Sequence, residues 1–270
     1  MTDPGATFIA GLPLATVVAA ALASLLCGLV GTFVVLRRLV ALGGGVAHAS
    51  FGGIGVAVVL GLDPRLGAAA VATGAALVLA AMPRERSDRR DAVIGVLWSV
   101  GMAVGILLLS RRGSGEVDVE SYLFGDIERV RASDLVLLAA LAALVSLAHV
   151  ARGRELVATA FDPEQAQLQG LPVRALDTLQ LLLATLSVVA LLELAGVVLA
   201  IALLAIPPLV ALRLFRSLSA IIGGAIALAF VILLAGLELG VRLAWPAGPA
   251  VVSVGALALG VAHLVPRRGR

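Results

Sequence analysis

The chain has 270 residues, of which 61% are hydrophobic and 14% are charged, and its mean hydropathy is +1.10. A water-soluble domain is about 45–50% apolar and about 25% charged, so this composition excludes a soluble fold and indicates the lipid bilayer as solvent. The basic residues are 20 arginines at the ends of apolar runs rather than in one patch, which argues against nucleic-acid binding. The single cysteine, Cys27, excludes an intrachain disulfide and is predicted to be a small membrane-buried residue.

Charged residues, prolines and glycine clusters divide the chain into nine apolar stretches, and a spanning helix needs about 20 such residues. The second and third are short and the sixth and seventh nearly touch, so eight spans stay an alternative. None alternates like barrel strands, so the sequence predicts an all-α integral membrane protein of eight or nine transmembrane helices. The stretches are 14–36, 46–62, 66–82, 92–110, 134–150, 177–194, 196–212, 218–240 and 249–265.

The arginines indicate the orientation, because positive charge is retained on the cytoplasmic side. With nine spans and the N-terminus outside, most arginines, including Arg37 and Arg38, fall in cytoplasmic segments. The sequence therefore predicts an N-out, C-in protein with residues 1–270 as a single transmembrane domain.

His48 lies in the glycine-rich segment LGGGVAHASFGGIG, at the start of the second span. A histidine in a membrane span usually faces the bundle interior or a water-filled path, and imidazole is a ligand for zinc, manganese and iron. The neighbouring glycines allow helices to approach closely. His48 is either a residue of a metal path or a structural histidine bonded to a backbone carbonyl.

Two segments are too polar to lie in the membrane, the outer segment 111–133 and the inner segment 151–176. Connections of this length usually have a function. Within the inner one, Asp162 followed by a proline indicates a helix start, and Gly170 indicates its end. The sequence predicts a short helix over 164–169 that is either a docking element or an ordinary amphipathic connector.

The later spans hold further polar residues and prolines. Asp177 is predicted to favour the dipole of the sixth span. Glu193, at the outer end of that span, either attracts an incoming divalent cation or snorkels to water. Pro207 and Pro208 predict a kink in the seventh span, which either shapes a gate or only affects packing.

Two simpler patterns predict pairing and packing. Glu238 is one helical turn before Arg242, and these side chains are predicted to form an ion pair. Gly101 and Gly105 form a small-xxx-small pair, which favours close helix packing.

Several of these segments resemble one family. The pattern Glu164-x-Ala166-x-x-x-Gly170 is similar to the cytoplasmic loop by which ABC importer permeases seat a short coupling helix in their ATPase. The wider segment 161–214 is similar to permeases of the zinc, manganese and iron branch. Three other segments resemble elements of that branch in the same order, namely 92–110, 117–127 and 245–252. The chain is identified as a member of this metal ABC permease family.

The resemblance implies an ABC type II importer-like permease of a prokaryotic cell membrane, which moves zinc, manganese or iron by alternating access. It implies that the chain is not an enzyme and holds no cofactor, since a partner ABC ATPase hydrolyses ATP. The ATPase would dock on segment 151–176, around Asp162, Glu164, Ala166 and Gly170. The other implied partners are an extracytoplasmic metal-binding protein and a second permease copy, identical or paired.

Many members of the family carry an aspartate four residues before the histidine that corresponds to His48, and this chain has Gly44 there. His48 would therefore contact the metal alone or with groups of another helix. His48 and Glu193 are the candidates for transient metal contact, and Pro207 and Pro208 are the candidates for a gate.

Three alternatives remain open at this stage. A permease of similar architecture could carry an iron chelate or a cobalamin-like molecule. A secondary transporter would work without an ATPase. An intramembrane enzyme would need two or more catalytic groups at membrane depth, and the sequence offers little besides His48 and Glu193.

Overall fold

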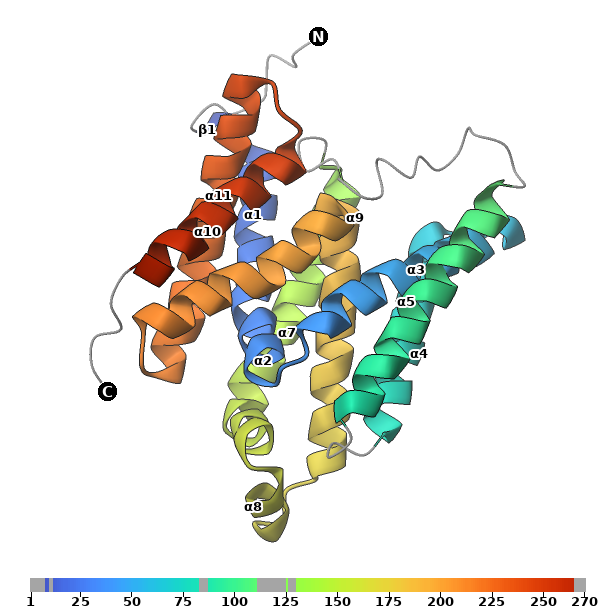
Figure 1. Cartoon of the computed structure of the whole chain (residues 1–270), viewed down its shortest axis with the longest axis vertical. Coiled ribbons are helices and arrows are strands. Elements are labelled where there is room, and N and C mark those ends of the chain that lie inside the picture. Colours follow the sequence, from blue (N-terminus) through green and yellow to red (C-terminus); the bar gives the residue numbers. More distant parts are fainter. Residues whose placement is uncertain (1–7, 10–11, 83–86, 111–124, 126–129, 265–270) are drawn as a thin grey trace. The chain divides into compact units, whose positions relative to one another are not determined.

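The computed structural model describes residues 8–9, 12–82, 87–110, 125 and 130–264, most of them helical (Figure 1). Strands β1 (Phe8–Ile9) and β2 (Leu12–Pro13) form a short antiparallel pair before the first helix. In this described part, eight helices are long and apolar enough to cross a membrane. The first of these eight is one stretch made of α1 (Leu14–Leu26), η1 (Cys27–Gly31) and α2 (Thr32–Leu36). The others are α3 (Val40–Leu60), α4 (Pro64–Ala81), α5 (Ser87–Ser110), α7 (Ala132–Phe161), α9 (Val173–Leu214), α10 (Leu218–Leu243) and α11 (Ala247–Leu264). The short helix α8 (Pro163–Leu168) lies between α7 and α9.

Helix α9 consists of two helices that join at Gly196. Its 42 residues would extend about 63 Å at the usual rise, roughly twice the ~30 Å hydrocarbon core. At Gly196 the backbone has φ 73° and ψ 170°, which essentially only glycine adopts, and α9 changes direction there (Figure 1). The segments 173–195 and 197–214 correspond to the sixth and seventh predicted spans. Counted separately, they give nine spans among the described residues.

The chain divides into two compact units. Unit 1 comprises residues 1–35, 120–145 and 190–270. Small residues let its helices approach closely: a side chain at Gly28 would overlap Ile226 of α10, and one at Gly236 of α10 would overlap Val251 of α11. Cys27 is fully buried in this unit, as predicted.

Unit 2 comprises residues 36–119 and 146–189, and α3 is its central helix, packed against α4 and α5. The backbones of α3 and α4 meet at Gly53 and Gly67. The predicted packing role of Gly101 and Gly105 is confirmed. Gly101 of α5 lies against Ala49 of α3, and Gly105 lies against Phe51 and Gly55.

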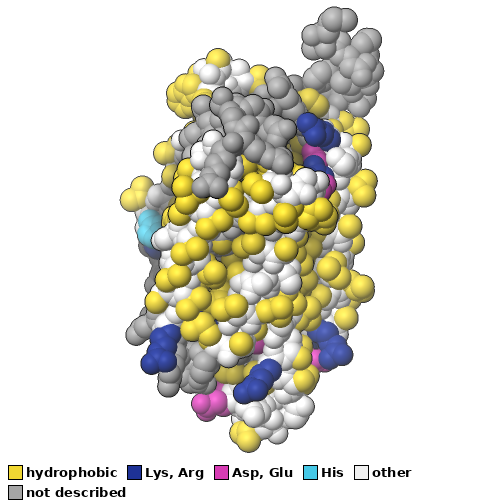
Figure 2. All heavy atoms as spheres, turned by 90° about the vertical axis from the view of Figure 1, so that its right-hand side faces the viewer, with side chains coloured by type: hydrophobic (Ala, Val, Ile, Leu, Met, Phe, Trp, Pro, Cys, Tyr) yellow, Lys and Arg dark blue, Asp and Glu magenta, His cyan; other side chains and the backbone are white. Residues whose placement is uncertain are grey.

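The surface of α5 away from α3 is apolar. Val96, Val100 and Leu107 are each more than half exposed. Figure 2 shows a face of the molecule covered by hydrophobic side chains across its middle, with charged side chains toward its ends. This distribution suits contact with lipid tails.

Two predicted span boundaries differ from the structure. Helix α3 begins at Val40 rather than at 46, because its glycines are buried against neighbouring helices, which compensates for their low helix propensity. Helix α7 continues to Phe161, so residues 151–161 of the predicted inner loop are helical. Arg152 pairs with Glu155 at 2.8 Å, and Leu156 is fully buried.

The outer segment predicted over 111–133 lies mostly outside the described residues. Gly125 and residues 130–133 are its described part. The resemblance of 117–127 to the outer element of the metal permeases therefore has no structural account here beyond Gly125.

Candidate functional site

His48 lies on the part of α3 that packs against α5. Its imidazole is half-buried and stacks on the Trp98 ring of α5, with centroids 4.5 Å apart and planes 9° apart. The Nδ1 atom is buried and has no hydrogen-bond partner among the residues described. The alternative of a histidine bonded through Nδ1 to a backbone carbonyl is therefore not what the structure shows.

The position of His48 is set by close contacts between α3 and α5 on either side of it. One turn earlier, a side chain at Gly45 would overlap Ile94. On the other side, a Cβ at Gly52 would lie 2.7 Å from the Gly101 carbonyl oxygen. These contacts fix the two helices against each other and hold the imidazole over the indole.

No cluster of three or more His, Cys, Asp or Glu side chains that could hold a metal ion occurs in the described part of the chain. Gly44, one turn before His48, is buried and offers no side-chain ligand. The arrangement around His48 can provide one imidazole nitrogen to a passing ion.

Glu193 belongs to unit 1 and lies on α9, three residues before the break at Gly196. Its side chain is half-buried. Gly125, whose φ is 67°, packs directly on the backbone of Ala195 and Gly196, where a Cβ on it would overlap both. Glu193 thus lies near a break in the helix at which Gly125 packs against Gly196.

Pro207 and Pro208 lie inside α9, in the segment that follows Gly196. The one non-helical residue found within α9 is Gly196. This break lies 11 residues before Pro207, at the boundary that the sequence predicts between the sixth and seventh spans, and the kink and gating role predicted for Pro207 and Pro208 stay predictions.

Helix α8 has the predicted bounds within a residue. The Asp162 carboxylate accepts a hydrogen bond of 2.9 Å from the Gln165 N–H and caps the helix, and Gly170 has φ 78° just after its end. Ala166 is 1% exposed, whereas Glu164 is exposed and Leu168 is 83% exposed. The helix is therefore anchored by one alanine and presents its other residues outward.

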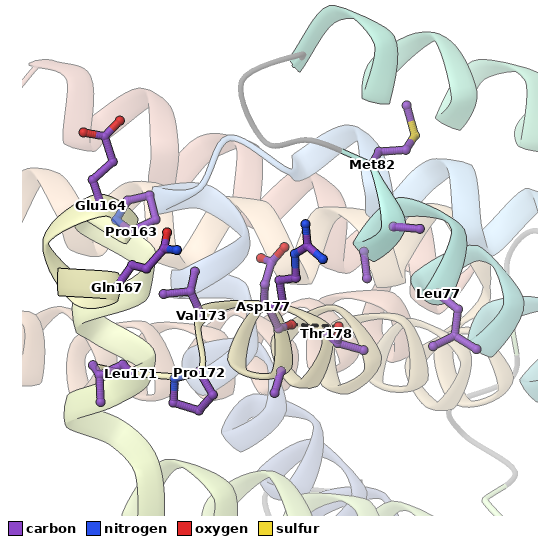
Figure 3. Close-up of a pocket in the computed structure, with 14 residues that line it drawn as sticks. Leu77, Met82, Pro163, Glu164, Gln167, Leu171, Pro172, Val173, Asp177 and Thr178 are labelled. Atoms are coloured by element: carbon purple, nitrogen blue, oxygen red, sulfur yellow. Dashed lines mark hydrogen bonds between the residues drawn. The ribbon is translucent and has the colours of Figure 1, made fainter. Parts of the chain in front are cut away.

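A groove of about 1230 Å³ lies beside α8 (Figure 3). Glu164 and Gln167 of α8 lie on one side of it, Leu77 and Met82 of α4 lie on the other, and Asp177 lies between them. All of these residues belong to unit 2. The groove and α8 together form a continuous surface on one end of this unit.

Asp177 does more than the sequence predicts. It is 4% exposed, and its carboxylate forms ion pairs with Arg37, between α2 and α3, and with Arg90 of α5, the second at 3.6 Å. Both arginine side chains are also buried. A helix-dipole role alone is therefore an incomplete account, and sequence reasoning missed the pairing because the three residues are far apart along the chain.

The remaining pairing prediction is confirmed. Arg242 forms an ion pair of 2.7 Å with Glu238 on the exposed side of α10. This pair involves neither α8 nor His48 and serves below as a control.

Comparisons with known proteins agree with this architecture. The model of the ABC 3 transport family matches residues 12–265. An uncharacterized membrane protein of Synechocystis sp. is 36% identical over 242 residues, covering 90% of this chain and 86% of that protein. The manganese transport system membrane protein MntC of Listeria innocua is 31% identical over 243 residues, with the same shares covered. The structure of PsaBC from Streptococcus pneumoniae in complex with Fab superposes with a TM-score of 0.83 at 26% identity, covering 94% of this chain and 92% of that one.

These matches extend over nearly the whole chain and pair it with membrane proteins of metal transport systems. They agree with the helices long enough to cross a membrane and with the motifs found along the sequence. The protein is a multi-pass membrane protein, and it belongs to the ABC 3 transport family, as a metal ABC transporter permease.

Proposed function

We propose that this chain is the permease subunit of an importer that moves a divalent transition metal ion inward, driven by ATP hydrolysis in a partner ATPase. The observation that carries the proposal is the match to the ABC 3 transport family over residues 12–265. The capped, outward-facing helix α8 supports it, because an ATP-driven permease needs a surface through which its ATPase acts.

Manganese is the first ion to test. Relatives at about 30% identity are named manganese transport proteins, and zinc and iron accept the same ligands. We propose that His48 contacts the ion transiently through its imidazole, and that Glu193 attracts the ion on the outer side. A single imidazole suits transport, because conduction requires a site weak enough to release the ion.

Helix α8 is proposed as the docking element for the ATPase. The Asp162 cap and Gly170 fix its length, Ala166 seats it, and Glu164 faces the partner. The ATPase binds and hydrolyses ATP, and this chain alternates the path between outward and inward access, with Pro207 and Pro208 shaping the gate.

The proposed assembly contains two permease copies, two ATPases and an extracytoplasmic metal-binding protein. In this assembly the N-terminus lies outside and the C-terminus inside. Nine spans would put the termini on opposite sides, and the arginine distribution supports a cytoplasmic position for α8.

Radiometal uptake by a metal-deficient bacterial strain tests the proposal. Wild type is expected to restore uptake of one divalent metal, and His48→Ala and Glu164→Ala are each expected to reduce it. His263→Ala and Glu238→Ala are the matched controls, because both residues are polar, lie elsewhere and are expected to leave uptake unchanged. Expression and membrane insertion are compared for all variants. If no divalent metal enters, the proposed cargo is wrong, and a chelate or cobalamin-like molecule is the next to test.

A further inference from the structure

The buried ion cluster of Arg37, Asp177 and Arg90, here called the base cluster, connects the surface beside α8 to the helices that carry His48 and Trp98. All of its residues belong to unit 2. Asp177 lies in the second turn of α9, which begins a few residues after α8 ends, and it also lines the groove beside α8. A displacement of α8 would therefore reach Asp177 over a short, continuous stretch of chain.

From Asp177 the contacts lead to two other helices. Arg37 pairs with the Asp177 carboxylate and donates a hydrogen bond of 2.7 Å to the Gln180 side chain on the next turn of α9. This arginine lies three residues before the start of α3, the helix of His48. Arg37 thus ties the beginning of α3 to the beginning of α9 through two separate bonds.

Arg90 makes the second connection. It lies near the start of α5, the helix of Trp98, approaches the other Asp177 oxygen at 3.6 Å and donates a bond of 2.7 Å to the Met82 carbonyl at the end of α4. Gln180 adds a tie to α7 by donating to the Leu156 carbonyl at 3.1 Å. The starts of α3, α5 and α9 and the end of α4 are thereby held at one point.

Burial makes this arrangement informative. The side chains of Arg37 and Asp177 are each 5% exposed and that of Arg90 is 7% exposed. Burying ions is costly, and packed apolar side chains often stabilise a protein as well as a buried ion pair does. Ion pairs and hydrogen bonds are directional, so they fix the positions of the helix ends relative to one another more specifically than apolar packing does.

Above this point, α3 and α5 are locked together by their small residues, so they move as a pair. A side chain at Gly45 would overlap Ile94, and one at Gly101 would overlap Ala49, next to His48. We propose that the base cluster transmits displacement of α8 to the α3–α5 pair and so couples events at the docking surface to the position of His48. Its three residues are positioning residues, and this inference rests on the proposed function of α8.

The test uses the permease purified with its ATPase and reconstituted with the metal-binding protein in proteoliposomes. The quantity measured is metal ions transported per ATP hydrolysed. Asp177→Asn keeps the shape of the side chain and removes its charge, and we expect it to lower this ratio at least about fivefold, the low end of typical coupling between sites, while ATP is still hydrolysed. Glu238→Gln, which breaks the exposed pair on α10, is expected to keep the wild-type ratio.

Hydrogen–deuterium exchange separates transmission from a general loss of structure. Addition of ATP and vanadate to the wild-type complex is expected to change exchange in α8 and in the first turns of α3 and α5. In Asp177→Asn the change in α8 should persist and the changes in α3 and α5 should disappear. A variant whose α3 and α5 respond as in wild type, or whose transport ratio is unchanged, overturns the inference.

A second variant covers the case in which Asp177→Asn does not fold. Replacing all three residues by apolar ones, as Arg37→Met, Asp177→Leu and Arg90→Met, removes every buried charge of the base cluster, and the complex is expected to assemble with the same loss of coupling. A triple variant with the wild-type ratio overturns the inference. Failure of the proposed function has a different signature, because wild type itself would then transport no metal or show no response of α8 to nucleotide.

Discussion

Replacing Gly101 by alanine is expected to force α3 and α5 apart next to His48. A Cβ at Gly101 would overlap the Ala49 Cα and lie 2.9 Å from the Ala49 carbonyl oxygen, whereas carbon atoms in good contact are about 3.5–4.0 Å apart. The obstacle is backbone, so no side-chain rotation relieves it. Either the helices separate or the clash remains.

The same helix provides the matched control. Gly95 also lies on α5, and a Cβ there would meet nothing within 4 Å. Both substitutions gain the same helix propensity, about 1 kcal/mol for alanine over glycine. Only Gly101→Ala meets the overlap, and overpacking costs about 1–3 kcal/mol. We therefore expect Gly101→Ala to be less stable than Gly95→Ala by about 1–3 kcal/mol, the whole overpacking cost.

Thermal unfolding of the two variants in the same detergent measures this difference as a lower Tm for Gly101→Ala. Tryptophan emission provides a local readout, because the chain has two tryptophans and Trp245→Phe leaves Trp98 as the one source. Gly101→Ala should change the Trp98 emission by disturbing its stack on His48, and Gly95→Ala should not. Equal Tm values and equal spectra for the two variants would refute the close-packing argument.

Three further predictions follow from single positions. Gly196→Ala places a Cβ on a backbone with φ 73° and ψ 170°, so it should cost about 1–3 kcal/mol and lower the Tm, whereas an unchanged Tm would show that the break is not strained. Asp162→Ala removes the cap on the Gln165 N–H, which should lower the stability of α8 by about 0.5–2 kcal/mol. Less ATPase should then co-purify with the permease, and an amount equal to wild type would contradict a docking role. Trp98→Leu removes the ring under His48, so metal uptake should fall with the Tm changed little, and full uptake would show that the stack does not position the imidazole.

The helices and the α8 motif could be predicted from the sequence because their signals are local. Apolar runs interrupted by charge mark spans. An aspartate before a proline, with a glycine eight residues after the aspartate, marks a short capped helix. Asp162 and Gly170 are therefore found where the pattern puts them. The pair of Glu238 and Arg242 could be predicted for the same reason, because it depends on a spacing of one helical turn.

The base cluster could not be predicted because its partners are distant in sequence. Asp177 lies 140 residues from Arg37, and nothing local indicates that the start of α9 meets the start of α3. The stack of Trp98 on His48 depends in the same way on how α3 packs against α5. The break in α9 differs from these two features, because Gly196 falls at the predicted boundary between the sixth and seventh spans, which a local signal in the sequence indicates.

Reconstituted transport tests the central claim most directly. The permease, its ATPase and the metal-binding protein are incorporated into proteoliposomes, and accumulation of manganese, zinc and iron inside is followed with and without ATP. The account predicts that at least one of these ions accumulates, that this accumulation requires ATP, and that Glu164→Ala reduces it without loss of the permease from the membrane. Accumulation that proceeds equally without ATP, or no accumulation of any divalent metal by a fully assembled complex, would contradict it.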